Sequence, residues 1–380
     1  MLRRVLCMLL AILFIFLSSC VSEVNPTAEV VNTHAPNPTS VKRSETFEAS
    51  VLAVGDIMFH LPQVQEAYTE QGYDFSMSFE KVRTLITQSD LAIANFETSI
   101  NESKKLSGYP RFNSPPEVLE GISKTGFDLM VTANNHCMDT GVEGAENTIE
   151  LIKKNGMIPL GTGDKQYKSS IIDVNTIKLG VLAYTTTING LKAPEGFVSM
   201  ADEGQIKKDI DAIKDNCDFV IVYMHTGVEY ARDVSEEQTR LFRAVADMGA
   251  DCVLGSHPHV AQRSELYDTR GKKVLINYSM GNFLSNQNDK YTDVGTMTKL
   301  IIKKQSGATY LANFEIIPTY RLRFIDTDGK TKRRIILASD IDGYNHISER
   351  DKQYIREVKY EVTKLLNEDE AEYFNLRDYN

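Results

Sequence analysis

The sequence predicts an α/β protein whose functional groups gather at the carboxyl ends of several buried strands. Strand-like apolar runs alternate with helical patterns along the chain, which is the order typical of α/β architecture. Six of these runs end directly in a short polar cluster, and α/β sheets place ligand groups just beyond the carboxyl ends of such strands. The clusters contain Asp, Glu, Asn and His, which bind divalent metal ions. The six runs are Ser50–Val54, Leu91–Ala94, Asp128–Ala133, Phe219–Tyr223, Asp251–Leu254 and Val274–Tyr278.

Residues 1–19 are predicted to be a signal peptide. A positively charged start precedes a short apolar core over residues 5–17, which is too short for a comfortable transmembrane helix. Residues 17–20 read Leu-Ser-Ser-Cys, which resembles the bacterial lipobox, where the cysteine is lipidated and becomes the new N-terminus. We therefore expect Cys20 to anchor an extracytoplasmic protein to the cell membrane. The alternative is an ordinary signal peptide with an incidental cysteine.

The chain after the signal peptide divides into three predicted parts. Residues 20–46 are rich in Asn, Pro, Thr and Ser and predict a flexible tether. Residues 47–325 carry the polar clusters and predict the folded domain. Residues 326–380 form a C-terminal extension ending in an amphipathic helix, whose apolar stripe is Ile355, Val358, Val362, Leu365 and Leu366.

Helices are expected between the strand-like runs, and antiparallel strands after them. The helical patterns cover Phe79–Thr87, Pro116–Thr125, Val142–Asn155, Asp202–Asp215 and Ser235–Met248. Ser235 begins a capping box, Asn155-Gly156 ends a helix, and Asp139-Thr140 can cap the helix that follows. Four consecutive antiparallel strands are expected near Met297–Lys303, Thr309–Pro318, Leu322–Phe324 and Arg334–Leu337, with a turn at Ser306-Gly307.

Charge and cysteine content exclude two classes of protein. The formal net charge of −10 over 380 residues argues against a nucleic-acid binder, which normally shows a basic face. With Cys20 lipidated, three cysteines remain, namely Cys137, Cys217 and Cys252, and this odd number argues against a disulfide framework. Cys217 and Cys252 lie in or beside apolar runs and are expected to be buried.

Four histidines fall inside the polar clusters and predict a metal site on one sheet edge: His136, His225, His257 and His259. The pair His257 and His259 follows Gly255, which permits a tight turn, while Pro258 fixes the backbone between the two imidazoles. Neutral imidazole is a common metal ligand near neutral pH.

Carboxylates and amides in the other clusters complete the predicted site. Asp56 offers a hard oxygen ligand, and Glu97 is a candidate bridging carboxylate. Asn135 offers an amide oxygen, and His136 is a candidate proton donor oriented by Asp139. The candidate substrate contacts are Asn95, Glu229 and Asn282, although Asn282 after Gly281 also fits a structural turn.

These motifs, in this order, resemble the CapA capsule-synthesis family, named also for poly-γ-glutamate biosynthesis. The matching segments are Gly55-Asp56-Ile57-Met58, Asn95-Phe96-Glu97, Asn134-Asn135-His136 with Asp139, His225 through Tyr230, Gly255 to His259, and Gly281-Asn282-Phe283. The family is similar to calcineurin-type metallophosphatases, which implies a four-layer α/β/β/α sandwich with two metals at the strand ends. Met58 departs from the phosphatase pattern, which has His there, and a thioether is a poor ligand for hard cations.

The resemblance implies a cell-surface metal-dependent hydrolase of capsule or poly-γ-glutamate synthesis or export. The implied metal ligands are Asp56, Glu97, Asn135, His225, His257 and His259, for one or two divalent ions of Mn, Mg, Zn or Fe. The implied partners are an anionic polymer such as poly-γ-glutamate or a capsule precursor, and membrane synthase or export subunits. The alternatives are a non-catalytic lipoprotein that binds polymer or assists a synthase, and a phosphoesterase unconnected with capsule.

Overall fold

The computed structural model describes residues 45–269, 271–327, 329–344 and 347–367. They belong to one compact unit that spans Ser44–Asn380. The predicted signal peptide, the lipidation site Cys20 and almost all of the predicted tether lie outside the described residues.

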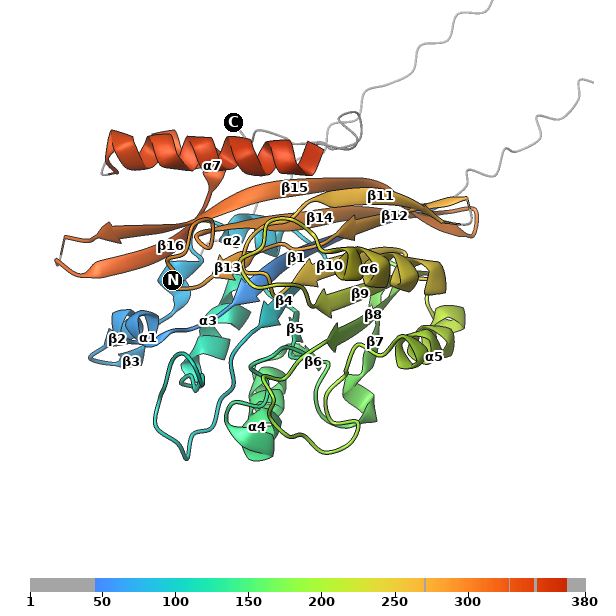
Figure 1. Ribbon diagram of the computed structural model, residues 1–380, viewed down its shortest axis with the longest axis horizontal. Helices are drawn as coiled ribbons and strands as arrows, with labels where there is room; N and C mark the ends of the chain where they lie inside the picture. The colour runs from blue at the N-terminus through green and yellow to red at the C-terminus, as the bar shows by residue number, and fades with distance from the viewer. Residues whose placement is uncertain (1–44, 270, 328, 345–346, 368–380) are drawn as a thin grey trace, which may run out of the picture. The chain divides into compact units, whose positions relative to one another are not determined.

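Two β-sheets form the centre of the described unit (Figure 1). The strands of the first sheet, in spatial order, are β16 (Thr331–Leu337), β15 (Ala308–Ile325), β14 (Val294–Gln305), β1 (Thr46–Ile57), β4 (Leu91–Phe96), β5 (Leu129–Val131) and β6 (Ile158–Leu160), while β13 (Asn282–Leu284) also pairs with β1. Those of the second sheet are β11 (Ser264–Thr269), β12 (Lys272–Asn277), β10 (Cys252–Ser256), β9 (Phe219–His225), β8 (Ile177–Thr185) and β7 (Ser169–Val174).

Seven α-helices lie in the part of the chain that the structure describes. They are α1 (Leu61–Ala67), α2 (Arg83–Thr87), α3 (Glu117–Thr125), α4 (Gly141–Lys154), α5 (Glu203–Ile213), α6 (Glu236–Met248) and α7 (Glu349–Asn367). A small hairpin of β2 (Tyr68–Thr69) and β3 (Gly72–Tyr73) follows α1, and short 3-10 turns occupy Ser76–Ser78, Lys165–Tyr167, Lys214–Asn216 and Ala338–Gly343.

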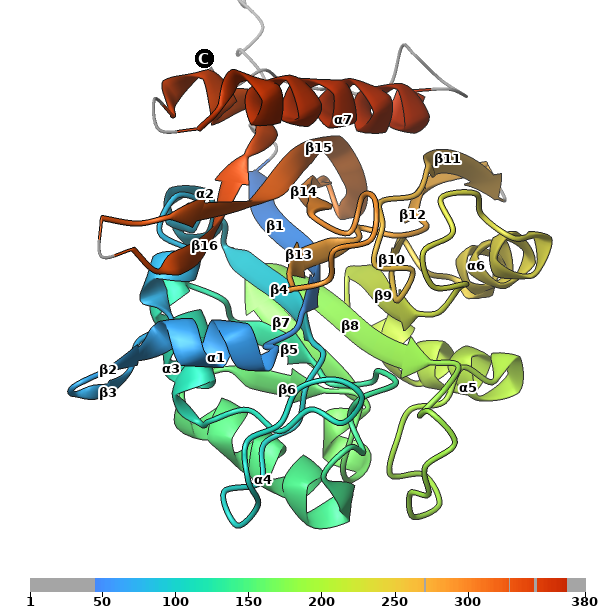
Figure 2. The ribbon, with the colours of Figure 1, turned by 60° about the vertical axis from the view of Figure 1, so that its left-hand side comes forward.

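The layers follow from the alternation of side chains along the strands. In β1, Val51 and Ala53 pack into the core between the two sheets, while Leu52 and Val54 pack into the core under the helices, because successive side chains point to opposite faces. Helices α1–α4 cover the first sheet, and α5 and α6 cover the second through Ile206, Ile210 and Phe242 among others. Figure 2 shows the two helical groups on opposite sides of the strands. The predicted four-layer α/β/β/α sandwich is confirmed.

The six predicted strand-like runs are confirmed as β1, β4, β5, β9, β10 and β12. They do not share one sheet edge as expected: β1, β4 and β5 pair in parallel in the first sheet, and β9, β10 and β12 in the second. The carboxyl ends of the two parallel groups meet, because Asp56 near the end of β1 contacts His259 after β10. An apolar run indicates a buried strand but not the sheet in which it pairs, so the sequence could not separate the two edges.

The C-terminal part differs from the expected series of four strands. Thr309–Pro318 and Leu322–Phe324 are not separate, because β15 is one continuous strand from Ala308 to Ile325. The turn at Ser306-Gly307 is confirmed, and both residues have the positive φ that a tight hairpin turn needs. The amphipathic helix is confirmed as α7, which places Val358 and Val362 in the core between the sheets and Ile355 in a smaller cluster with Leu322 and Ile336.

The helices match the predicted patterns with one large exception. Only Arg83–Thr87 of the expected helix Phe79–Thr87 is α-helical. Residues 79–82 form turns that follow the 3-10 turn Ser76–Ser78, and Phe79 is fully buried. Ser235 caps α6 by accepting a hydrogen bond from the backbone of Gln238. Cys137, Cys217 and Cys252 are all free thiols; Cys137 and Cys252 are buried and Cys217 is half-buried. Within the described ranges, none of the helices has the length and apolar character needed to cross a membrane.

Candidate metal centre

Three buried side chains from separate strand ends place ligand atoms close together. Asp56 lies near the end of β1, Glu97 directly follows β4, and His259 follows β10. One ligand atom of each lies within 4.8 Å of the others. Asp56 and Glu97 have no exposed surface, and His259 is 2% exposed. Two carboxylates and an imidazole at this spacing have the chemistry of a divalent cation site.

Asn95 holds the two carboxylates in position. Its amide nitrogen donates to Asp56 Oδ1 over 2.8 Å and lies 3.4 Å from Glu97 Oε2. Its amide oxygen accepts a hydrogen bond of 3.0 Å from Asn134, which donates also to the backbone oxygen of Phe96. Asn95 is completely buried. Its role as a substrate contact stays a prediction, whereas its contacts with the carboxylates are those of a residue that orients ligands.

Glu97 lies between two groups of ligand atoms. Its Oε1 is 3.7 Å from His225 Nε2 and 3.8 Å from His259 Nε2. This oxygen is buried and has no hydrogen-bond partner. A buried polar atom without a partner is costly, and a cation bound to Oε1 would satisfy it. The residues present therefore fit a bound divalent ion.

A second group of ligand atoms lies on the other side of Glu97. His225 Nε2 is 2.9 Å from Asn135 Oδ1 and 3.2 Å from His257 Nδ1. An amide oxygen and two imidazoles thus converge within reach of the Glu97 carboxylate. All six predicted ligands lie in this centre, as Asp56, Glu97 and His259 on one side and Asn135, His225 and His257 on the other. Glu97 Oε1 lies 3.7–3.8 Å from an imidazole nitrogen of each group, and Asp56 Oδ1 also lies 3.7 Å from His225 Nδ1.

Burial and neighbouring charges set the protonation of the centre. Burial acts to raise the pKa of Asp56, but the hydrogen bonds with His259 and Asn95 and the nearby imidazoles of His225 and His259 together outweigh burial and hold the pKa well below its usual range. Burial and the adjacent charge of Asp56 raise the pKa of Glu97 well above its usual value. Burial and the neighbouring His257 lower the pKa of His225 well below 6.5, and burial lowers that of His257 to about 4. Both imidazoles are therefore neutral near pH 7, as metal ligands must be.

The loop that carries His257 and His259 has an unusual backbone. His257 has a φ of 99° and His259 has a φ of 60°, in the left-handed region that residues other than glycine rarely adopt. Gly255, just before them, approaches the neighbouring chain so closely that an added Cβ would lie 2.0 Å from the carbonyl oxygen of Tyr278. The predicted tight turn at Gly255 is thus a close approach of two strands, β10 and the end of β12.

His136 and Asp139 form the predicted pair beside the ligands. His136 Nδ1 is 2.7 Å from Asp139 Oδ2, and the same oxygen accepts a 2.7 Å hydrogen bond from the backbone nitrogen of Phe112. The Phe112 ring packs edge-on against the His136 imidazole at 4.7 Å between centroids. Asp139 does not cap α4, whose N-cap residue, Thr140, makes no side-chain capping bond. The expected capping role was wrong: Asp139 precedes the N-cap residue, its Oδ2 is turned to His136 and to the backbone of Phe112, and its Oδ1 makes no hydrogen bond among the described residues.

The two remaining predicted substrate contacts differ in exposure. Glu229 is exposed, and its negative charge helps to raise the pKa of Glu97. Asn282 is 4% exposed and pairs in register with Asp56 across β13 and β1. The Asn282 amide donates to Gln287 and to the backbone oxygen of Thr292, which is the structural use that a turn predicts.

Sequence reasoning missed four residues that support the centre: His60, Asn134, Tyr230 and Ser256. The hydroxyl of Ser256 lies 2.8 Å from His225 Nδ1, and the Tyr230 ring packs 5.9 Å from the His259 ring. His60 lies four residues after Asp56, and its ring packs edge-on against Phe112. The position of Asn134, Tyr230 and Ser256 inside the motifs was a usable signal, whereas His60 acquires its place only through tertiary packing.

Comparisons with known proteins agree with the motifs. The sequence model of a family described as "Bacterial capsule synthesis protein PGA_cap" matches residues 50–287, more than half of the chain. The chain is 31% identical over 262 residues to the capsule biosynthesis protein CapA of Bacillus anthracis, covering 65% of this chain and 62% of that protein. It is 30% identical over 296 residues to the PGA biosynthesis protein CapA of Bacillus subtilis (strain 168), covering 72% of this chain and 73% of that protein. The chain thus spans less than two thirds of the length of the Bacillus anthracis relative.

Solved structures similar to the chain include two proteins with phosphoesterase names. The calcineurin-like phosphoesterase YfkN from Bacillus subtilis superposes with a TM-score of 0.43 at 16% identity, over 84% of this chain and 99% of that chain. The 5'-nucleotidase from Candida albicans SC5314 superposes with a TM-score of 0.41 at 12% identity, over 83% of this chain and 58% of that chain.

Proposed function

The chain belongs to the bacterial capsule synthesis family, and from this premise we propose that it is a metal-dependent hydrolase acting on an anionic polymer or its precursor at the cell surface. The single observation that carries the proposal is the Oε1 atom of Glu97. This oxygen is buried without a hydrogen-bond partner, and it lies 3.7–3.8 Å from imidazole nitrogens of two separate ligand groups. Such an arrangement suits a carboxylate that bridges two cations.

The ligands divide into two sets that share Glu97. Asp56 and His259 would hold one ion, and Asn135, His225 and His257 would hold the other. The oxygen and nitrogen donors are compatible with Mn, Mg, Zn or Fe. When bound, a divalent ion supplies Lewis-acid polarisation of a carbonyl or phosphoryl oxygen and lowers the pKa of a bound water.

His136 is the proposed general acid. Its Nδ1 faces Asp139, so a proton on Nδ1 is held by the carboxylate and Nε2 is the nitrogen left for transfer to a leaving group. The Asp139 carboxylate is itself fixed by the backbone of Phe112. The pair therefore holds the imidazole in one orientation.

The substrate class follows from the family and from charge. The relatives are named for capsule and PGA biosynthesis, so the proposed substrate is a polyanion such as poly-γ-glutamate or a capsule precursor. The chain's own net charge of −10 repels such a polymer, and bound cations would reverse the field at the centre. Membrane synthase or export subunits are proposed partners. Lipidation at Cys20 would hold the enzyme at the membrane where the polymer emerges.

The test combines metal analysis with turnover. Purified protein is assayed for bound metal and for hydrolysis of a panel of phosphoester and γ-glutamyl compounds, beside the His136→Ala variant. We expect hydrolysis of at least one class, abolished by chelation and reduced about 10²–10⁴-fold in His136→Ala. If the protein binds metal and polymer but hydrolyses nothing, and His136→Ala leaves polymer output in cells unchanged, the non-catalytic role replaces the enzymatic one.

A further inference from the structure

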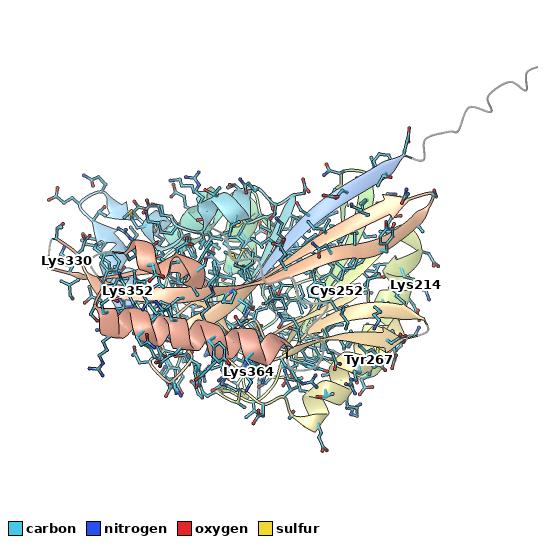
Figure 3. All side chains as sticks on the ribbon, turned by 90° about the horizontal axis from the view of Figure 1, so that it is seen from above. Lys214, Cys252, Tyr267, Lys330, Lys352 and Lys364 are labelled. Carbon is cyan, nitrogen blue, oxygen red and sulfur yellow. The ribbon has the colours of Figure 1, made fainter. Side chains whose placement is uncertain are left out.

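A groove lined with basic residues begins beside the metal centre. It has a volume of about 500 Å³ and lies between α1 and the β15–β16 hairpin. Three cations, Arg323, Lys330 and Arg333, and one carboxylate, Glu66, line it. A local positive excess is unusual in a chain with net charge −10. Figure 3 shows Lys330 at the outer end of the hairpin, beyond the start of α7.

The groove is joined to the metal centre through a short segment after β13. Asn286 lines the groove, and its backbone nitrogen donates a 3.3 Å hydrogen bond to His60 Nδ1. The next residue, Gln287, accepts a 2.9 Å hydrogen bond from Arg321 through its backbone oxygen. His60 follows Asp56 by four residues, so the inner end of the groove lies against the chain that carries a metal ligand.

Two arginines face each other across the hairpin with too little negative charge to balance them. Arg323 on β15 stands directly opposite Arg333 on β16. Like charges at directly opposite positions destabilise a sheet. Arg333 is 5% exposed and binds Glu66, while its Nε is buried without a partner. Arg323 is exposed, and its side chain makes no ion pair or hydrogen bond with the described residues.

Arg321 extends this row of cations toward the metal centre. It lies two residues before Arg323 on the same strand, so both side chains belong to the same face of the sheet, about 7 Å apart along β15. Arg321 is 6% exposed, and its Nε is buried without a hydrogen-bond partner. Arg321 and Arg323 therefore place two guanidinium groups on one face of β15, from the segment beside His60 outward to the groove.

The contacts in the groove indicate the chemistry of its ligand. Arg333 binds the Glu66 carboxylate through two donors, its backbone nitrogen and Nη1, the latter at 2.8 Å. The groove thus already holds one carboxylate, between the backbone N–H and one guanidinium N–H of the same arginine. No aromatic residue lines it, whereas sites for single-stranded nucleic acid stack bases on aromatic rings. A linear chain with a carboxylate on each repeat can pair several of its carboxylates with this row of cations.

We infer that the groove between α1 and the β15–β16 hairpin binds a carboxylate-rich polymer chain that extends outward from the metal centre. This inference rests on the proposed function for the polymer that reaches the centre. Arg323 and Lys330 provide exposed charge, and Arg333 and Arg321 provide buried donors nearer the centre. The metal centre would then act on one linkage while the groove holds the neighbouring repeats.

The experiment uses fluorescence anisotropy to measure how a labelled, short γ-linked oligoglutamate binds to the full-length protein. The double variant Arg323→Glu with Lys330→Glu is compared with a control carrying the same charge change, Lys154→Glu with Lys208→Glu, at exposed positions on α4 and α5. We expect the groove variant to bind at least about tenfold more weakly and the control to bind as the unaltered protein does. The difference should shrink at high salt because exposed charges are screened.

Three results would overturn the inference: no binding of the oligoglutamate by the unaltered protein, equal weakening in both double variants, or equal competition by an oligonucleotide of the same charge. Thermal melting and Mn²⁺ binding are measured for every variant, so that a loss of fold is recognised. The outcome is separable from that of the proposed function. Binding that depends on Arg323 and Lys330 without any hydrolysis supports the groove and contradicts the hydrolase.

Discussion

The side-chain amide of Asn95 donates a 2.8 Å hydrogen bond to Asp56 and lies 3.4 Å from Glu97, so one neutral residue fixes both carboxylates of the candidate metal centre. Without it, two buried carboxylates would face each other with no donor between them. Asn134 donates a hydrogen bond to the amide oxygen of Asn95, so the amide nitrogen of Asn95 is the end that faces the two carboxylates. Much of the geometry of the candidate centre therefore depends on two residues that need not touch a metal.

Replacement of Asn95 by alanine is expected to weaken Mn²⁺ binding about 10–100-fold, which is the usual cost of losing a residue that orients ligands. Isothermal titration calorimetry measures the affinity directly. Asn147→Ala is the matched control. Asn147 lies on helix α4, and its replacement also removes a side-chain amide hydrogen bond, the one to the backbone oxygen of Ile100. An unchanged affinity in Asn95→Ala would contradict the positioning role.

The two ligand groups predict two separable binding steps. His259→Ala should remove the ion held with Asp56, and His257→Ala should remove the ion held with Asn135 and His225, since each histidine belongs to a different group. Metal content per chain, measured by mass spectrometry after dialysis, should fall from two to one in each variant. If both variants lose all metal, the centre holds a single ion that both histidines support.

Asp139→Asn is expected to lower kcat about 10–100-fold with little change in KM or metal content, because a neutral amide is a weaker acceptor for His136 Nδ1 and orients the imidazole less firmly. The readout is steady-state kinetics on the best substrate of the panel. Glu146→Gln on the exposed face of α4 makes the same chemical change away from the centre. A fall in metal content equal to the fall in kcat would show instead that Asp139 only supports the fold of the site.

Stability in acid should depend on Glu265. Burial acts to raise the pKa of this carboxylate, but hydrogen bonds from Arg243, Arg263 and Tyr278 outweigh burial and lower it to about 2 from an ordinary value of 4.5. A lowered folded-state pKa stabilises the protein above the unfolded value, and the contribution is lost as pH falls from about 4.5 toward 2. After discounting for solvent screening we expect about 1–2 kcal/mol.

The measurement for Glu265 is urea unfolding at neutral pH and at several acidic values. Glu265→Gln should be less stable than the unaltered protein at neutral pH, and the gap should narrow as the pH falls below 4.5. Glu195→Gln, at an exposed position, should show no such narrowing. A gap between Glu265→Gln and the unaltered protein that stays constant across this range would contradict the assignment.

The sequence predicted the strands and the ligands better than the connections between them. Buried parallel strands are recognisable because both faces are apolar, and the polar residue after each one stands out against that background. The partner sheet of each strand, the burial of Asn95 and the contact of Asp139 with Phe112 depend on residues far apart in sequence. β15 was predicted as two pieces, because the polar stretch Thr319-Tyr320-Arg321 interrupts its apolar pattern although the strand continues through it.

The basic groove was not predicted for a related reason. Arg321, Arg323 and Arg333 look like ordinary charges of solvent-exposed strands until β15 pairs with β16. Only the register that sets Arg323 opposite Arg333 reveals a concentration of like charge. Composition pointed the other way, because net charge averages over surfaces that have opposite signs.

His257 and His259 have a left-handed backbone, which costs the fold stability, and both are candidate metal ligands. Glycine adopts positive φ at no steric cost, so His257→Gly or His259→Gly would relax the loop while deleting an imidazole. Screening variants for heat resistance alone would therefore favour proteins that have lost the centre. The metal content of a thermostable variant should be measured before a stable fold is taken as evidence that the variant is active.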